Sequence, residues 1–575
     1  MGRPIADLHN HPSLKPHGNK DIANIWVKSE NKKAKEFFTA LSVRKIIVNF
    51  ILKKMAVYSQ SNLQDCFEGQ NRLIFCSIYP FERPFMKPVR PFEEAKWLPR
   101  QVLKFIFKKQ LLPRGIKIDE KIISLLTGVS RVHAGEMLEA IYDDTTYLDY
   151  YKDYLSEYQY LLNASDSTSP FPINGKTPVF KLVKNYGEFL ANENEETICG
   201  IITTEGIHAF GKYVKHSLFT KSSINELPTE EQEALASSFI DNIKNVKSKE
   251  YPPFFITFSH HFNSLVAGQA KSFADGSGVA PGFSDVFNQK RGVENGITAF
   301  AKALITQHLL SRENGPRILI DTKHMSINAR RDFYEMIHAH NATGNDNVPI
   351  ISSHTAISGM KTLTEAEKTA DNKDTDDDSY VSRWDINLTD EDILEIFKSD
   401  GLIGICMHDG RMPGERFKKK AKKLEKKTPE DLKKLHVQIF MTNVFHIVDI
   451  NHGYIKQFNL AHPDKAIDLK EAWKTICLGS DNDGIVDPFD NYDTAASLDR
   501  FRTDCITMLR EYENPENVDF HPISIPIEEP ISPEKLLQLL AGQSIYQVMD
   551  RVFYHNTSVF LSKYFTDEYL RGAVV

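Results

Sequence analysis

The chain opens with Ile5-Ala6-Asp7-Leu8-His9-Asn10-His11, a short apolar run that ends on two histidines. Side chains alternate faces along a strand, so His9 and His11 project the same way and can share one metal ion. Neutral imidazoles are the usual nitrogen ligands of zinc-like metals. The stretch therefore predicts a strand that presents a metal-binding pair at its carboxyl end.

Seven further apolar runs of strand length follow along the 575 residues, separated mostly by segments with helical periodicity. Such runs suit parallel strands that are buried on both faces. Their alternation with helices predicts an α/β fold, a (β/α)8 TIM barrel with large, mainly helical insertions. The predicted strands are Pro4–His9, Leu73–Tyr79, Thr197–Glu205, Phe254–His260, Ile318–His324, Val348–His354, Leu402–His408 and Thr475–Asp481.

The clearest predicted helices are Gly292–Leu310, Ala329–His338 and Asp390–Lys398, the last with Thr389 as its N-cap. We expect a single barrel over 1–575, with its extra length in three parts. These are a mainly helical insertion between strands two and three (81–196), a lysine-rich helical insertion (410–470) and C-terminal helices (533–575).

Composition narrows the classes of partner. The formal charge of -7 is small for this length, so nucleic acid is not expected as a partner. Uninterrupted apolar runs stay shorter than the roughly 20 residues that span a bilayer, so no membrane span is expected. The start lacks the pattern of a secretory signal, and the six cysteines do not fall in tight pairs. We therefore expect a cytoplasmic protein.

Several predicted strands end on a side chain that can bind metal or transfer a proton. In a (β/α)8 barrel the carboxyl ends of the strands surround one mouth, where active sites lie. Imidazoles and carboxylates gathered there would be costly to desolvate unless metal compensated them. The groups are His9 and His11, Glu205, His324, His354 and Asp481.

Six motifs in chain order carry a resemblance to a known family. They are Asp7–His11, Thr203–Ala209, Ile256–Asn263, Leu319–Ser326, Pro349–Ala356 and Gly479–Gly484. Together they resemble the membrane dipeptidase (renal dipeptidase) family of the amidohydrolase superfamily. The resemblance implies a metal-dependent hydrolase barrel that cleaves a dipeptide or a similar small amide, and it suggests a homodimer.

The resemblance also implies two divalent metal ions, with zinc as the expected metal. His9 and His11 would hold one ion, His324 and His354 the other, and Glu205 would bridge them. Two such ions about 3.5–4 Å apart can share a hydroxide, lower its pKa and polarise a carbonyl.

Two residues would complete the catalysis of amide hydrolysis. Asp481 would take the proton of the attacking hydroxide and deliver it to the leaving amine. His260 would contact the substrate and steady the oxyanion.

The sequence departs from the family's pattern at two places. The first motif ends His-x-His where the family typically has His-x-Asp, so a neutral nitrogen of His11 stands in place of an anion. The family also places an arginine directly before an Asn-x-x-Asp helix start. Here Ile386 precedes Asn387 and Arg383 lies one loop turn earlier. Arg383 is the candidate for binding a substrate carboxylate, and Arg411 is a further candidate anion anchor.

Neighbouring polar residues are expected to have structural roles. His261 should face away from His260 on a strand, His208 lies past the strand end, and Asp483 is expected to shape the turn around Asp481. Two alternatives to a dipeptidase stay open. One is another amidohydrolase reaction, the hydrolysis of a lactone or phosphoester. The other is a non-catalytic metal-binding barrel whose insertions bind a partner protein.

Overall fold

The structure is a computed structural model of the chain. It describes residues 3–19, 24–28, 59–86, 111–112, 115–116, 124, 129–142, 146–272, 289, 291–343, 346–367, 379–424, 429–513 and 531–572. The sequence also predicts a loop at 368–382, which is polar and acidic, and an extended connector at 522–533. Most of both segments lies outside the described residues.

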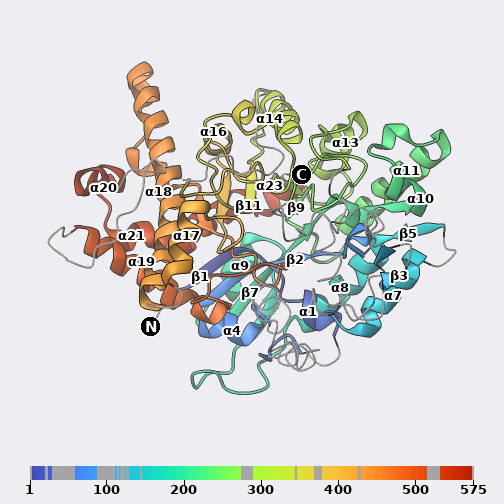
Figure 1. Cartoon of the computed structure of the whole chain (residues 1–575), viewed down its shortest axis with the longest axis horizontal. Helices are drawn as coiled ribbons and strands as arrows, with labels where there is room; N and C mark the ends of the chain where they lie inside the picture. Colours follow the sequence, from blue (N-terminus) through green and yellow to red (C-terminus); the bar gives the residue numbers. More distant parts are fainter. Residues whose placement is uncertain are drawn as a thin grey trace.

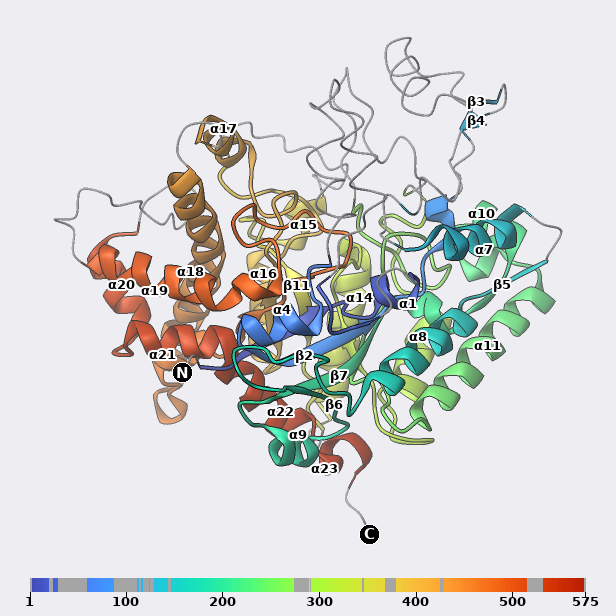
Figure 2. The same cartoon turned by 90° about the horizontal axis from the view of Figure 1, so that it is seen from below.

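Eight parallel strands form a closed ring at the centre of the molecule (Figures 1 and 2). Each strand pairs with the next in chain order, and the last pairs with the first through Asp7 and Leu478. Every predicted strand has a counterpart in the ring, so the predicted (β/α)8 barrel is confirmed. The strands are β1 (Ile5–Asn10), β2 (Asn71–Ile78), β7 (Thr197–Glu205), β9 (Phe255–Thr257), β10 (Leu319–Asp321), β11 (Ile351–Thr355), β12 (Leu402–Ile405) and β13 (Ile476–Leu478).

The ring strands are almost entirely buried because helices cover their outer faces. A ninth strand, β6 (Val179–Leu182), pairs with the first half of β7 and lies outside the ring. Helices occupy the connections between successive ring strands. They are α4 (Leu63–Glu68), α8 (Tyr150–Ala164), α11 (Thr229–Lys247), α13 (Ala299–Leu304), α14 (Ile327–Asn341), α16 (Asp390–Lys398) and α18 (Pro429–Ala461).

The bounds of the predicted helices agree with the structure to different degrees. The helix predicted at Asp390–Lys398 has those bounds, and the hydroxyl of Thr389 caps it by accepting from the backbone N–H of Asp392. The helix predicted from Gly292 is wrong in its first turns, because α13 begins at Ala299 after the cap Thr298. Gly292 has a φ of +72°, outside the helical region, so the chain there is a loop.

Two groups of described helices lie on opposite sides of the barrel. In both cartoons α18, α19 (Leu498–Glu513), α20 (Pro533–Leu540) and α21 (Ile545–Asp550) lie on one side, and α7 (Arg131–Tyr142), α8 and α11 lie on the other (Figures 1 and 2). The described chain contains further α-helices and strands. They are α1 (Leu14–His17), α9 (Tyr186–Asn192), α10 (Lys215–Thr220), α15 (Leu363–Glu367), α17 (Glu415–Leu424), α22 (Asn556–Tyr564), α23 (Asp567–Arg571), β3 (Leu111–Leu112), β4 (Gly115–Ile116), β5 (Tyr147–Asp149) and β8 (Lys212–Val214).

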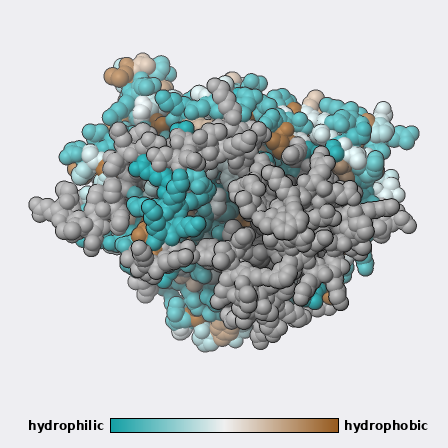
Figure 3. All heavy atoms as spheres, in the orientation of Figure 1, coloured by the Kyte–Doolittle hydropathy of each residue, from teal (hydrophilic) through white to brown (hydrophobic). Residues whose placement is uncertain are grey.

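The three predicted extra segments contain helices in their described parts: α7 to α9 within 81–196, α17 and α18 within 410–470, and α20 to α23 within 533–575. The domain boundaries stay predictions. Hydrophilic side chains gather over α17, whose Phe417 is buried while its lysines are at least partly exposed (Figure 3). Among the described helices, none combines the length and apolar character that a membrane span requires.

Candidate metal centre

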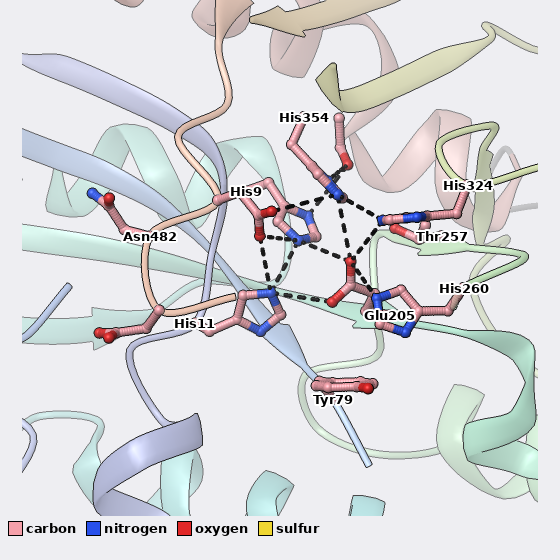
Figure 4. A network of polar contacts seen from close by, with 12 residues as sticks. His9, His11, Tyr79, Glu205, Thr257, His260, His324, His354 and Asn482 are labelled. Atoms are coloured by element: carbon pink, nitrogen blue, oxygen red, sulfur yellow. Dashed lines mark hydrogen bonds and ion pairs between the residues drawn. The ribbon is translucent and has the colours of Figure 1, made fainter. Parts of the chain in front are cut away.

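β1 brings two imidazoles to the mouth of the barrel. His9 lies within the strand and His11 directly follows it, and both side chains are fully buried. Their Nε2 atoms lie 3.1 Å apart (Figure 4). Asp7 anchors the strand because its carboxylate accepts hydrogen bonds from the backbone and the hydroxyl of Ser480, at 2.8 and 2.5 Å. The two nitrogens predicted to share an ion therefore point at one place.

Glu205, the last residue of β7, points to the same place from the second strand along the ring from β1. Its Oε2 lies 3.2 Å from Nε2 of His11, and its Oε1 lies 3.5 Å from Nε2 of His9. Oε1 also lies 3.7 Å from Nε2 of His324 and 3.6 Å from Nε2 of His354. Burial alone would raise the pKa of this carboxyl, but the surrounding histidines lower it well below its ordinary value. Glu205 thus lies between two pairs of imidazoles.

The second pair of imidazoles comes from β10 and β11. His354 lies in β11 and His324 follows β10, and their Nε2 atoms are 3.1 Å apart. The other ring nitrogens contact hydroxyls: Nδ1 of His324 lies 3.2 Å from Oγ of Ser272, and Nδ1 of His354 lies 2.9 Å from Oγ of Ser353. The same Ser353 hydroxyl lies 3.2 Å from Nδ1 of His9. These contacts orient the rings so that Nε2 faces the centre.

Asp481 enters from the turn after β13. Its backbone N–H donates to the carbonyl of His9 at 2.9 Å, which ties the turn to β1. Its Oδ1 lies 3.7 Å from Nε2 of His9 and 3.6 Å from Nε2 of His11, and its Oδ2 lies 3.8 Å from Nε2 of His354. A Cβ atom on Gly484 would lie 2.0 Å from Oδ1 of Asp481. This turn therefore requires glycine if the carboxylate is to face the histidines.

The donor atoms of these residues fit divalent metal ions. Among the described residues, four buried groups have all their ligand atoms within 4.8 Å of one another: His9, His11 and Glu205; Glu205, His324 and His354; His9, His354 and Asp481; and His260, His261 and His324. Within the described chain, Oδ1 of Asp481 accepts no hydrogen bond. Imidazole nitrogens 3.1 Å apart and a buried carboxylate oxygen without a donor are both stabilised by a cation. Nitrogen and carboxylate ligands of this kind suit zinc and similar metals.

His260 lies beside the centre and is held by a second carboxylate. Its Nε2 lies 3.3 Å from Oε1 of Glu205, and its Nδ1 lies 2.7 Å from Oε2 of Glu82, a residue in the segment after β2. The hydroxyl of Tyr79 donates to the same Glu82 oxygen at 3.1 Å. Burial acts to lower the pKa of His260, but Glu205 and Glu82 raise it to about 9. The ring is thereby fixed with Nε2 towards the mouth.

The expectation that His261 faces away from His260 is wrong. The two rings lie 3.7 Å apart, and the ring of His261 is 5.0 Å from that of His324. The physical reason is that β9 ends at Thr257, so residues 260 and 261 lie beyond the strand and do not alternate. His208 lies on the short turn after β7, where its Nε2 is 2.8 Å from the carbonyl oxygen of Pro80.

The contacts of Asp483 hold the turn after β13 in place. Its carboxylate accepts from the backbone N–H groups of Gln60 and Ser61 at 2.8–3.0 Å, and it forms an ion pair with Nζ of Lys15 at 2.7 Å. These contacts join the turn after β13 to the segment that precedes α4. They match the expectation that Asp483 shapes the turn that carries Asp481.

The two candidate arginines lie on neighbouring segments. Arg383 precedes α16, and Arg411 lies on the loop after β12. The side-chain amide of Asn387 joins the segments, since it donates to the carbonyls of Ser382 and Arg411, each at 3.0 Å. Of the two cations, Arg411 lowers the pKa of His324 through its charge, after burial and the charges of His260 and His261. The role of Arg383 in binding substrate stays a prediction.

The sequence reasoning missed Glu82, Lys323 and Ser353, which all contact or flank the centre. Glu82 follows an apolar strand by a few residues, and this weak signal is shared with many loop residues. Lys323 carried a clearer signal of a functional role, because it is a charged residue directly before the predicted ligand His324. Ser353 gave no signal, since a serine inside a strand is common in parallel sheets.

Comparisons with known proteins give structural similarities only. No family model matches the sequence, and no curated protein matches it. A solved dipeptidase of metallopeptidase family M19 is similar with 13% identity and a TM-score of 0.43, and the match covers 100% of both chains. A metallopeptidase from Rhodobacter sphaeroides, solved with a phosphinate mimic of L-Ala-D-Ala, is similar with 12% identity and a TM-score of 0.38, over 96% of this chain and 100% of that one. A probable dipeptidase from Pseudomonas aeruginosa shows 10% identity and a TM-score of 0.36, over 88% of each chain.

Proposed function

We propose that this protein is a metal-dependent hydrolase of the dipeptidase kind, which cleaves the amide bond of a small substrate. The observation that carries the proposal is the position of Glu205 between two pairs of imidazoles. One carboxylate oxygen lies 3.2 Å from Nε2 of His11, and the other lies 3.6 and 3.7 Å from His354 and His324. A carboxylate in that position can serve two ions at once.

Five residues would hold the metal, which we propose to be a pair of zinc ions: His9, His11, Glu205, His324 and His354. When bound, the ions would supply a nucleophilic water at neutral pH and polarise the substrate carbonyl.

The protein's own groups would do the remaining work. Oδ1 of Asp481 would take a proton from the attacking water as its oxygen bonds to the carbonyl carbon. The same carboxyl would then give that proton to the amide nitrogen as the carbon–nitrogen bond breaks. Nε2 of His260 would donate a hydrogen bond to the developing oxyanion, and Glu82 would keep that nitrogen directed at the mouth.

Metal analysis paired with a dipeptide screen tests the proposal. We expect about two metal ions per chain, as two-metal hydrolase sites require. Glu205→Ala should lose metal and activity together, because both ion positions use its carboxylate. Asp481→Asn should keep most of its metal and lose kcat by about 10²–10⁴, the usual contribution of a general acid–base group.

The exposed carboxylate of Asp468 provides a matched control, and Asp468→Asn should leave metal content and kcat unchanged. A fully active preparation without metal would refute the proposal. Hydrolysis of phosphoesters or lactones in place of dipeptides would favour another amidohydrolase reaction. A metal-loaded protein that cleaves no amide, lactone or ester would favour the non-catalytic barrel.

A further inference from the structure

Two buried cations lie at the mouth of the barrel without a carboxylate partner. Lys323 follows β10 directly before the ligand His324, and it is 2% exposed. Within the described chain, its Nζ makes no hydrogen bond. Arg411, on the loop after β12, is 6% exposed, and its guanidinium has no ion pair to any described residue. Lysine and arginine side chains are rarely buried without such a partner.

The two cations lie on the same part of the barrel mouth. Lys323 follows β10 and Arg411 lies on the loop after β12. Both strands pair in parallel with β11, which carries His354, so their carboxyl ends lie at the same edge of the ring. The two residues therefore flank His354, on the side of the mouth formed by β10 to β12.

Three described carboxylates near Lys323 and Arg411 have other partners. Asp321 accepts from the hydroxyls of Thr257 and Ser353, each at 2.5 Å. Asp481 faces His9 and His11, as described above, and Asp409 pairs with His436 at 3.2 Å.

Neither cation therefore forms an ion pair with a described carboxylate. Burying such charges is unfavourable unless something pairs with them.

We propose that Lys323 and Arg411 form a subsite for two negative charges of the substrate, so that the preferred substrates are small amides with two carboxylates. A dipeptide whose C-terminal residue is acidic is the simplest such substrate. The guanidinium would hold one carboxylate through two parallel hydrogen bonds, and the ammonium would serve as a point charge for the other. The choice of an amide rests on the proposed function, whereas the subsite itself does not.

Paired acidic and neutral compounds test the subsite directly. On the metal-loaded protein, calorimetry should show aspartate binding at least about tenfold more tightly than asparagine, tested as both enantiomers. The value of kcat/KM should likewise be higher for Ala-Asp than for Ala-Asn. Lys323→Met and Arg411→Gln should each reduce the aspartate-to-asparagine ratio by about tenfold or more, with the change mainly in KM.

Lys398, an exposed lysine at the end of α16, provides a matched control, and Lys398→Met should leave the ratio unchanged. An equal affinity of the wild-type protein for aspartate and asparagine would overturn the proposal, and this result needs no variant to fold. An unchanged ratio in both site variants would overturn it too.

These experiments can distinguish a failure of the subsite proposal from a failure of the proposed function. Selective aspartate binding that is lost in Lys323→Met, without hydrolysis of any dipeptide, would support the subsite and refute the dipeptidase. Equal hydrolysis of Ala-Asp and Ala-Asn by the wild-type protein would refute the subsite and leave the dipeptidase standing.

Discussion

Single hydroxyl groups determine how the histidines of the centre are oriented. Ser353 contacts Nδ1 of both His9 and His354, and its hydroxyl donates to Asp321 at 2.5 Å. One residue therefore links an imidazole of the first pair to an imidazole of the second. Contacts of this kind set which ring nitrogen is available to a metal ion. The geometry of the centre depends on residues that bind no metal themselves.

Asp385 is a buried carboxyl that makes folding dependent on pH. It is 2% exposed, and within the described chain its Oδ1 accepts no hydrogen bond. Burial raises its pKa from 3.8 to about 7, and the charge of Arg330 offsets only part of that effect. Between pH 4 and 7 the unfolded chain loses this proton while the folded chain keeps it. Stability contributed by the protonated group is therefore lost as the pH rises across this window.

We predict that Asp385→Asn stabilises the protein at pH 8, by about 1–3 kcal/mol, because it removes the buried charge. At pH 4 the variant and the wild-type protein should have similar stability, since both carry a neutral side chain. Thermal unfolding at the two pH values measures the difference. Asp468→Asn, at an exposed position, should show no such pH dependence. A variant that is less stable than wild type at pH 8 would contradict the assignment.

At the scale of elements, a buried ion pair joins helices α14 and α16. The guanidinium of Arg330 donates to Oδ2 of Asp392 at 2.7 Å, and the hydroxyl of Tyr334 donates to Oδ1 at 2.7 Å. The same carboxylate completes the capping box of α16 by accepting from the backbone N–H of Thr389 at 2.8 Å. Asp392 thus connects the start of one helix to the buried face of another.

Removal of the Asp392 carboxylate should destabilise the folded protein. We predict that Asp392→Ala lowers the free energy of unfolding by about 3–5 kcal/mol, because Arg330 is left buried without its partner. Denaturant unfolding gives the value. Arg330→Met in the Asp392→Ala background should restore part of the loss, since it removes the unpaired charge. A double variant less stable than Asp392→Ala would show that the ion pair is not the origin of the effect.

The elements also show how far sequence reasoning reaches. α16 could be predicted to the residue because a capping box and an amphipathic face agree within nine positions. The sequence could locate the strands but could not predict their last residues, because the apolar runs continue past the last hydrogen bond between strands. That error matters at β9, where the alternation rule was applied to His261 after the strand had ended at Thr257. Local patterns predict that an element is present more reliably than they predict where side chains point after the element ends.

At the scale of the whole molecule, ring closure brings together groups that are far apart in the sequence. His9 and Asp481 meet because β1 pairs with β13, and the pairing of neighbouring strands brings Glu205 and His354 to the same mouth. The proposed metal ligands could be located from the sequence because they lie near or just after the carboxyl ends of barrel strands. The contact of Glu82 with His260, and the position of Lys323 near Arg411, could not be predicted. Both depend on loop conformation, which no periodic sequence pattern encodes.

The same closure makes the metal centre a link across the barrel. The proposed ligands come from β1, β7, β10 and β11, so bound ions would connect strands on different sides of the ring. A ligand that binds only the folded state stabilises it, by about 4 kcal/mol when its free concentration is a thousand times Kd.

We therefore predict that chelation lowers Tm by a few degrees, since the shift per kcal/mol is small for a long chain. Calorimetric unfolding with and without chelator measures the shift, and added zinc should reverse it. Glu205→Gln should unfold at the same temperature in both conditions, because it binds little metal. If chelation leaves the wild-type Tm unchanged while metal analysis shows the ions removed, the centre does not link the strands, and the barrel closes without help from metal.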